Sequence, residues 1–154
     1  MEKTTTTEKL NEILRKTRPD DLEEYFEANR EKLAEEQQPF AYYMRARFRE
    51  KKLKQQDVFL AADISEGYGY KLISEEKRTR QRDVILRICL AARFTLQETQ
   101  KALRLYGMSP LYPKMARDCV FIIALNQGIY DIQEVDRLLA SYDFEALYSC
   151  RETE

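Results

Sequence analysis

Apolar residues recur every three or four positions along most of this 154-residue chain, which is the spacing of helices that bury one face. The pattern predicts helices over 7–16, 20–37, from 40 onwards, 55–62 and 66–74 in the first half. In the second half it predicts helices over 82–92, 95–106, 114–126 and 131–140, which form two helical hairpins. The first five or so residues are expected to fray. The pattern therefore predicts an all-α fold of seven to nine helices without a β-sheet.

Capping residues support several of these helix ends. Thr95 and Glu98 have the spacing of a capping box, and Asp131 is followed by an acid three residues later. Gly107 and Gly128 follow predicted helices at places suited to a left-handed stop. The segments 84–92 and 115–125 are apolar nearly all round, which is typical of helices buried on several sides. We therefore expect these two helices to be the most buried.

Charge divides the chain into segments. Residues 1–38 hold 7 Lys and Arg against 11 Asp and Glu, residues 39–83 hold 11 against 7, and residues 84–154 hold 8 against 9. We interpret 1–38 as an acidic helical arm that ends at Pro39, and 39–93 as a basic domain. Residues 94–150 would then be the C-terminal helical hairpins, and 151–154 a loose tail. A basic segment between acidic neighbours favours a nucleic-acid-binding surface.

Composition argues against several classes of function. Histidine is absent, which removes the commonest general base and most zinc sites. The cysteines, Cys89, Cys119 and Cys150, have no CxxC spacing and indicate reduced thiols in a cytoplasmic protein. The longest apolar run, residues 119–125, is too short to span a membrane, and the N-terminus has no apolar signal core. We therefore expect no enzyme activity, no metal, no cofactor and no membrane association.

One constellation carries a more specific signal. Two short predicted helices, 55–62 and 66–74, flank the turn at Asp63, Ile64 and Ser65, with a basic helix before them and a buried helix after them. This is the layout of a helix-turn-helix, whose second helix reads the major groove of DNA. The first helix would place its start against a phosphate. The expected DNA-contacting residues are Gln55, Gln56, Ser65, Glu66, Gly67, Tyr70, Lys71, Lys77, Arg78 and Arg80.

The same region resembles a known family. The run RARFREKKLKQQDVFLAADISEGYGYKLISEEKR is similar to the phage-repressor-like, or Xre-type, helix-turn-helix of bacteria. More closely, the chain resembles small bacterial proteins that combine this domain with a C-terminal helical extension. The shared elements are Tyr68-Gly69-Tyr70-Lys71-Leu72-Ile73, Arg82-Asp83, Glu98-Thr99-Gln100, Leu111-Tyr112-Pro113 and Arg117-Asp118. The resemblance covers about residues 40–140 and implies a phage-repressor-like domain embedded in a multi-helix bundle.

Details of the resemblance lead to further expectations. The family has a small residue on its first short helix against a medium one on its second, and those places fall here on Phe59 and Gly69. The exchanged sizes keep the total volume, so these residues should pack together. Asp63 and Glu75 stand where the family has glycine, and Lys71 stands where it has glutamine. The two Arg-Asp pairs each open a helix, where an Arg could bridge to a neighbouring helix.

Two functions remain open. The first is a sequence-specific transcriptional regulator that binds double-stranded DNA through the helix at 65–74. The alternative is a helical adaptor for protein partners, bound through the acidic arm or the C-terminal hairpins, in which DNA binding has been lost. The acids Glu66, Glu75 and Glu76 favour the adaptor. Phe144, Leu147 and Tyr148 are expected to pack back on the helical bundle. For a homodimer, the candidate surfaces are the acidic N-terminal arm and the segment 114–148, and 114–148 is preferred because these three residues are also expected to leave apolar area there.

Overall fold

The computed structural model describes residues 2–29 and 39–149, and all regular secondary structure within them is helical. The chain divides into two units, Met1–Gln37 and Gln38–Glu154. Nine α-helices and one short 3-10 helix lie in the described ranges, which confirms the all-α class. None of these helices is both long and apolar enough to cross a lipid bilayer.

The first unit contains α1 (Glu2–Lys16), the 3-10 helix Pro19–Asp21 and α2 (Leu22–Ala28). The prediction that the first residues fray was wrong, because α1 already begins at Glu2. The prediction of a helix from 20 to 37 was also wrong. Asn29 is the C-cap of α2, where the backbone leaves the helical conformation (φ −118°, ψ 18°), and its side-chain Nδ2 donates to the carbonyl of Tyr25. Residues 30–38 lie outside the described ranges.

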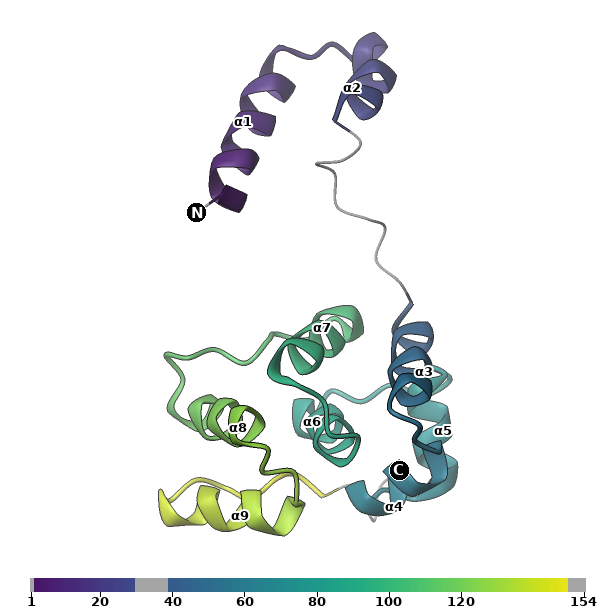
Figure 1. Cartoon of the computed structure of the whole chain (residues 1–154), viewed down its shortest axis with the longest axis vertical. Coiled ribbons are helices and arrows are strands. Elements are labelled where there is room, and N and C mark those ends of the chain that lie inside the picture. The colour runs from purple at the N-terminus through teal and green to yellow at the C-terminus, as the bar shows by residue number, and fades with distance from the viewer. Residues whose placement is uncertain (1, 30–38, 150–154) are drawn as a thin grey trace. The chain divides into compact units, whose positions relative to one another are not determined.

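The described residues of the second unit form seven helices, whose arrangement Figure 1 shows. They are α3 (Phe40–Glu50), α4 (Gln55–Ala62), α5 (Glu66–Ile73), α6 (Arg82–Ala91), α7 (Leu96–Tyr106), α8 (Ala116–Gln127) and α9 (Ile132–Ser141). The predicted bounds of these helices were therefore correct to within two residues wherever both ends were predicted. Residues 39–93 and 94–149 belong to this one unit.

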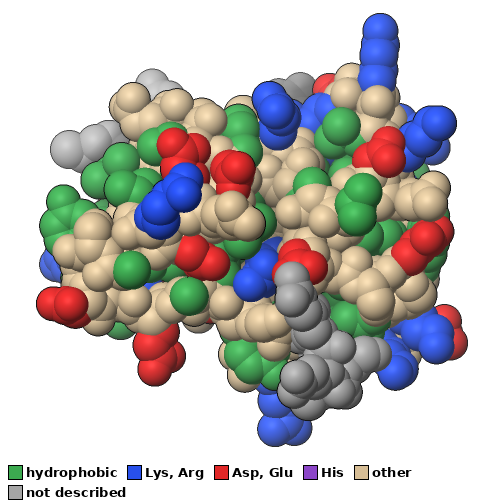
Figure 2. All heavy atoms as spheres, turned by 90° about the horizontal axis from the view of Figure 1, so that it is seen from below, with side chains coloured by type: hydrophobic (Ala, Val, Ile, Leu, Met, Phe, Trp, Pro, Cys, Tyr) green, Lys and Arg blue, Asp and Glu red, His purple; other side chains and the backbone are tan. Residues whose placement is uncertain are grey.

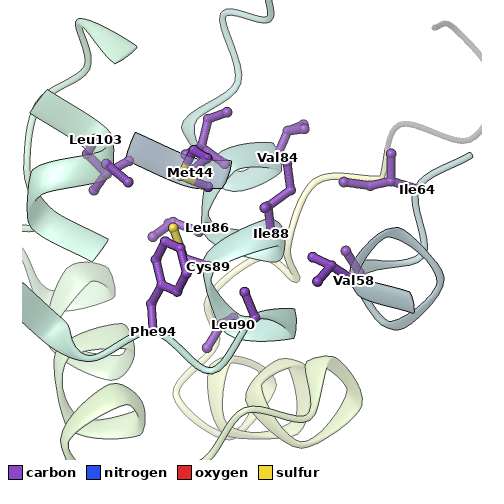
Figure 3. Close-up of a cluster of buried hydrophobic side chains, with 14 of the residues drawn as sticks. Met44, Val58, Ile64, Val84, Leu86, Ile88, Cys89, Leu90, Phe94 and Leu103 are labelled. Atoms are coloured by element: carbon purple, nitrogen blue, oxygen red, sulfur yellow. The ribbon is translucent and has the colours of Figure 1, made fainter. Parts of the chain in front are cut away.

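Helix α6 is the centre of the second unit. Every side chain from Val84 to Leu90 is at most 5% exposed, and α4, α7 and α9 all pack against this helix. Figure 3 shows Val58 of α4 facing Ile88 on one side of α6, while Phe94 lies beside Cys89 on another. An all-round apolar sequence is therefore satisfied by neighbours on several sides.

Helix α8 differs from its prediction. Only Asp118, Phe121, Ala124 and Leu125 are buried, and Ile123 is 58% exposed. The expectation that 115–125 is one of the two most buried helices was therefore wrong, because α7 and α9 cover only one part of α8. An apolar face of α8 stays in contact with solvent.

The predicted caps of the later helices are present. Thr95 Oγ1 accepts from the N–H of Glu98 at 3.1 Å, and Glu98 Oε1 accepts from the N–H of Thr95 at 2.9 Å. Gly107 (φ 86°) and Gly128 (φ 72°) end α7 and α8 in the left-handed conformation, which glycine adopts without a steric penalty. Asp131 caps α9 by accepting from the N–H of Gln133 at 2.8 Å. These short-range patterns fix the helix ends of the C-terminal half.

Candidate functional site

The candidate site is built on α4 and α5, which are joined by Asp63, Ile64 and Ser65. Asp63 ends α4 with φ 58°, the left-handed conformation that turns the chain sharply. Ile64 is 5% exposed, and its backbone N–H donates to the carbonyl of Phe59 at 3.0 Å. The turn is therefore anchored both by a left-handed residue and by an apolar side chain that fills the angle between the helices.

Phe59 and Gly69 hold the two helices together as the sequence predicts. Phe59 is fully buried, and a Cβ atom placed on Gly69 would lie 2.5 Å from Phe59 Cγ. No side chain fits at such a distance, so α5 approaches the ring with its bare backbone. The ring of Tyr70 meets Phe59 edge-on, with centroids 5.1 Å apart.

Helix α5 has one buried and one exposed side. Tyr68, Gly69, Leu72 and Ile73 are buried. The expected contact residues on the other side are all exposed, and they are Ser65, Glu66, Gly67, Tyr70 and Lys71. The structure therefore brings these five predicted site residues together along one side of a short helix.

The start of α4 supplies hydrogen-bond donors. Its N-cap, Lys54, makes no side-chain capping bond, so the first backbone N–H groups of α4 have no cap from that residue. Gln55 Oε1 is enclosed without a hydrogen-bond partner among the described residues, which leaves Nε2 as the available group of this amide. Gln56 is exposed beside it. Backbone and amide donors at a helix start suit an anionic oxygen.

The loop after α5 divides the remaining predicted residues. Arg78 pairs with Glu75 at 2.6 Å, stacks over the ring of Tyr106 at 4.1 Å and donates to the carbonyl of Tyr106. Arg78 is therefore occupied by contacts with its own fold. Lys77 and Arg80 are exposed and form no ion pair among the described residues.

Two left-handed residues frame α5. Asp63 precedes it with φ 58°, and Glu75 follows it with φ 64°. These are the two positions at which the resembled family has glycine. A left-handed conformation explains a glycine preference there, because a Cβ atom disfavours it.

Basic side chains surround this part of the unit. Among the described residues, those of 39–83 that are exposed and form no ion pair are Arg45, Arg49, Lys52, Lys54, Lys71, Lys77 and Arg80. Seen from below, Lys and Arg side chains border the α4 side of the molecule, while hydrophobic side chains are exposed over α9 (Figure 2). The excess positive charge of 39–83 is thus presented to solvent.

The described residues contain no group of three or more His, Cys, Asp or Glu side chains placed to hold a metal ion. The functional geometry that the structure does show is a helix pair with an exposed polar side and basic surroundings.

Sequence reasoning missed a second polar site around the C-terminal segment. Arg87, in the middle of the buried helix α6, donates to the carbonyls of Ala62, Leu147 and Tyr148 at 3.2, 3.1 and 2.7 Å. Asp136 of α9 accepts from the N–H of Leu147 at 2.8 Å. The available signal was Arg87 itself, because a charge inside an otherwise apolar run must find several hydrogen-bond partners when buried.

Compared with models of protein families, with curated proteins and with solved structures, the chain gives no significant match.

Proposed function

We propose that this protein is a sequence-specific DNA-binding regulator, in which α4, the turn and α5 act as a helix-turn-helix of the phage-repressor-like type. Helix α5 would enter the major groove of double-stranded DNA, and α4 would lie across the backbone. The observation that carries the proposal is the row of exposed residues on α5, which consists of Ser65, Glu66, Gly67, Tyr70 and Lys71. It is polar and lies on a helix whose opposite side is locked against Phe59.

The chemistry of the row suits base edges. Lys71 can donate to guanine, and Tyr70 and Ser65 can donate or accept. Gly67 has no other atoms within 4 Å of where its Cβ would lie, so the backbone at this position can approach a groove closely. Tyr70 is 41% exposed, and Phe59 fixes the position of its ring. A side chain held in this way recognises a base with little loss of conformational freedom.

Phosphate contacts would come from the neighbouring groups. The start of α4, with Gln55 and Gln56, offers N–H donors. Lys77 and Arg80 are exposed beyond the end of α5. Arg78 is removed from this set, because its guanidinium group already binds Glu75 and Tyr106.

The acids near α5 reduce the attraction to DNA less than the sequence suggests. Glu75 is neutralised by Arg78 at 2.6 Å. Glu66 and Glu76 stay exposed; a Glu at the start of a reading helix can accept from the amino group of cytosine. Across 39–83, the exposed basic side chains that form no ion pair among the described residues outnumber all the exposed acids, which are Glu50, Asp57, Asp63, Glu66 and Glu76.

The rival function, a protein-binding adaptor, is favoured by a different observation. Ile123 of α8 and Tyr142 after α9 are 58% and 67% exposed, and exposed apolar area is typical of protein contacts. This face lies on α8 and α9, apart from α5 (Figure 1). The two functions can therefore be tested separately.

The deciding experiment is fluorescence anisotropy of a labelled random duplex, titrated with the full chain from about 50 to 200 mM salt. The proposal expects binding in the micromolar range that weakens steeply with salt, because each phosphate contact releases counterions. A matched pair of variants locates the surface. Lys71→Ala should weaken binding, whereas Lys114→Ala, which removes an exposed lysine next to α8, should not. No binding at the lowest salt would end the proposal and leave the adaptor.

A further inference from the structure

The chain's last described segment is held in an unusual way. We call residues 143–149 the C-terminal strap. From Glu145 to Tyr148 its backbone bonds to charged side chains of α6, α8 and α9. Arg117 Nη2 donates to the carbonyls of Glu145 and Ala146 at 3.1 and 3.3 Å, and Asp83 Oδ2 accepts from the N–H of Tyr148 at 2.9 Å. Arg87 donates to the carbonyls of Leu147 and Tyr148, and Asp136 accepts from the N–H of Leu147. These four side chains form a clamp for an extended peptide.

The clamp binds the backbone of the strap and buries one of its side chains, that of Leu147. Leu147 is 4% exposed, while Phe144 and Tyr148 are half-buried and Glu145 and Ala146 are exposed. Backbone groups are the same whichever copy of the chain supplies them. The strap of a second molecule would therefore make the same hydrogen bonds and bury the same leucine.

The connection between α9 and the strap is short and strained. Helix α9 ends at Ser141, and the chain reverses through Tyr142 and Asp143, whose φ is 62°. The N–H groups of Asp143 and Phe144 bond back to the last turn of α9, to Ala140 and Leu139. A left-handed residue that is not glycine costs free energy, and short strained hinges favour exchange of the segment that follows them.

An uncharged groove of about 470 Å³ begins at this hinge. Cys119, Val120 and Ile123 of α8 and Leu138 of α9 line it, together with Tyr142 and Phe144 on either side of Asp143. Opening the hinge would carry Phe144 away and lengthen the apolar face. A strap that crosses to another molecule brings the two hinges together, and with them the two grooves.

From these observations we infer that two copies of this chain form a dimer by exchanging their C-terminal straps, each strap occupying the clamp of the other copy. The occupant is fixed by complementarity, since the strap already fits the clamp and an uncharged face can meet its own copy across a two-fold axis. The exchange releases Asp143 from its left-handed conformation. This inference goes beyond the proposed DNA binding and does not depend on it.

A pair of hinge variants tests the exchange by light scattering over a concentration series. The wild-type chain, of 18.3 kDa, should reach twice that mass. Asp143→Gly accepts the left-handed turn without penalty, so it should favour the closed strap and raise the dimer dissociation constant about tenfold or more. Asp143→Pro cannot adopt a positive φ, so it should lower that constant. A wild-type chain that stays monomeric at high concentration overturns the inference, as does an equal response of the two variants.

A complementation experiment distinguishes exchange from simple side-by-side docking. Leu147→Asp spoils the strap but leaves the clamp, and Asp136→Lys spoils the clamp but leaves the strap. Each variant alone should be monomeric, with folding checked by circular dichroism. Refolded together, they should form a mixed dimer, because one intact strap meets one intact clamp. Dimers of either variant alone, or no mixed dimer, would contradict the exchange. Neither measurement involves DNA, so failure of this inference is distinguishable from failure of the proposed DNA binding.

Discussion

Arg117 of α8 binds Asp83 of α6 with two parallel hydrogen bonds, Nη1 to Oδ1 at 3.0 Å and Nη2 to Oδ2 at 2.9 Å. The residues next to them form the reciprocal pair, since Arg82 of α6 binds Asp118 of α8. Asp83 and Arg117 are 34 positions apart in the chain, and Arg82 and Asp118 are 36 apart, so two distant Arg-Asp dipeptides exchange partners and join the starts of two helices. The sequence predicts Arg residues that bridge helices at these positions, and the bridges are confirmed.

The Asp83 ion pair predicts how stability depends on pH. Burial acts to raise the pKa of Asp83, but the hydrogen bonds from Arg117 and from the N–H of Tyr148, with the charges of Arg117 and Arg82, outweigh it and lower the pKa below the ordinary 3.8. A pKa depressed by folding means that the ionised carboxylate stabilises the folded state. That stabilisation is complete above the unfolded pKa and is lost as the pH falls through the folded one.

We therefore expect Asp83→Asn to lower the free energy of unfolding by about 2 kcal/mol near pH 7, because Arg117 loses a charged partner. The difference from wild type should shrink below pH 3.8. Urea unfolding at a series of pH values measures it. Glu76→Gln, an exposed site without an ion pair among the described residues, is the control and should change stability little. A constant difference down to the lowest pH would show that the ion pair is not its cause.

The two glycines of α5 form a matched pair. Gly69→Ala should destabilise the protein by about 1–3 kcal/mol, because the new Cβ would lie 2.5 Å from Phe59. Gly67→Ala meets no atom within 4 Å and should be neutral or stabilising by up to about 1 kcal/mol, the gain in helix propensity. Thermal unfolding of the two variants gives the comparison. Equal effects would mean that α5 does not pack on Phe59 at this register.

The same contact can be measured by a double-mutant cycle. Phe59→Ala creates a cavity and should cost about 3–5 kcal/mol. In the Gly69→Val background it should cost clearly less, because valine fills part of the space. Strict additivity of the two changes would contradict the contact.

The cysteines predict a thiol-labelling pattern. Burial raises the pKa of the Cys89 thiol to about 12, so this thiol is both enclosed and protonated, whereas Cys119 is partly exposed. In a Cys150→Ser chain, a disulfide reagent should label Cys119 in the native state and Cys89 only on unfolding. The Cys119→Ser, Cys150→Ser chain is the control, and rapid native labelling there would show that α6 opens easily.

The sequence predicted the features that depend on residues close together in the chain. The capping box at Thr95, the glycine stops and the Phe59–Gly69 contact each depend on residues within about ten positions, or on a size relation visible in the sequence. The early end of α2 was missed because Asn29 leaves the helical conformation and its side chain bonds to the carbonyl of Tyr25, a local choice that the helical spacing of the sequence does not show. The exposed face of α8 was missed because periodicity does not show how many neighbours a helix has.

The clamp around the strap could not be predicted from the sequence. Arg87 meets Leu147 and Tyr148 across 60 and 61 positions, and Asp83 meets Tyr148 across 65. A single sequence gives no pairing over such distances. Leu147 is buried, which confirms the expectation that it packs back on the bundle, whereas the expectation that it leaves apolar area for a dimer was wrong. Ile123 and Tyr142 carry that area instead.

The last prediction concerns how Lys71 contacts DNA. Its side chain is exposed one turn into α5, next to Tyr70 and on the side that faces away from Phe59. If Lys71 reads a guanine edge, Lys71→Ala should cost about 1–3 kcal/mol on the preferred site and relax the preference at one base pair. If Lys71 meets only phosphate, the loss should be equal on all duplexes, and the salt slope should fall by about one unit. Gln55→Ala should also weaken binding equally on all duplexes but leave the slope unchanged, because a neutral amide displaces no counterion. Anisotropy titrations on selected and random duplexes separate these outcomes, and a Lys71→Ala chain that binds both as the wild type does would place α5 outside the groove.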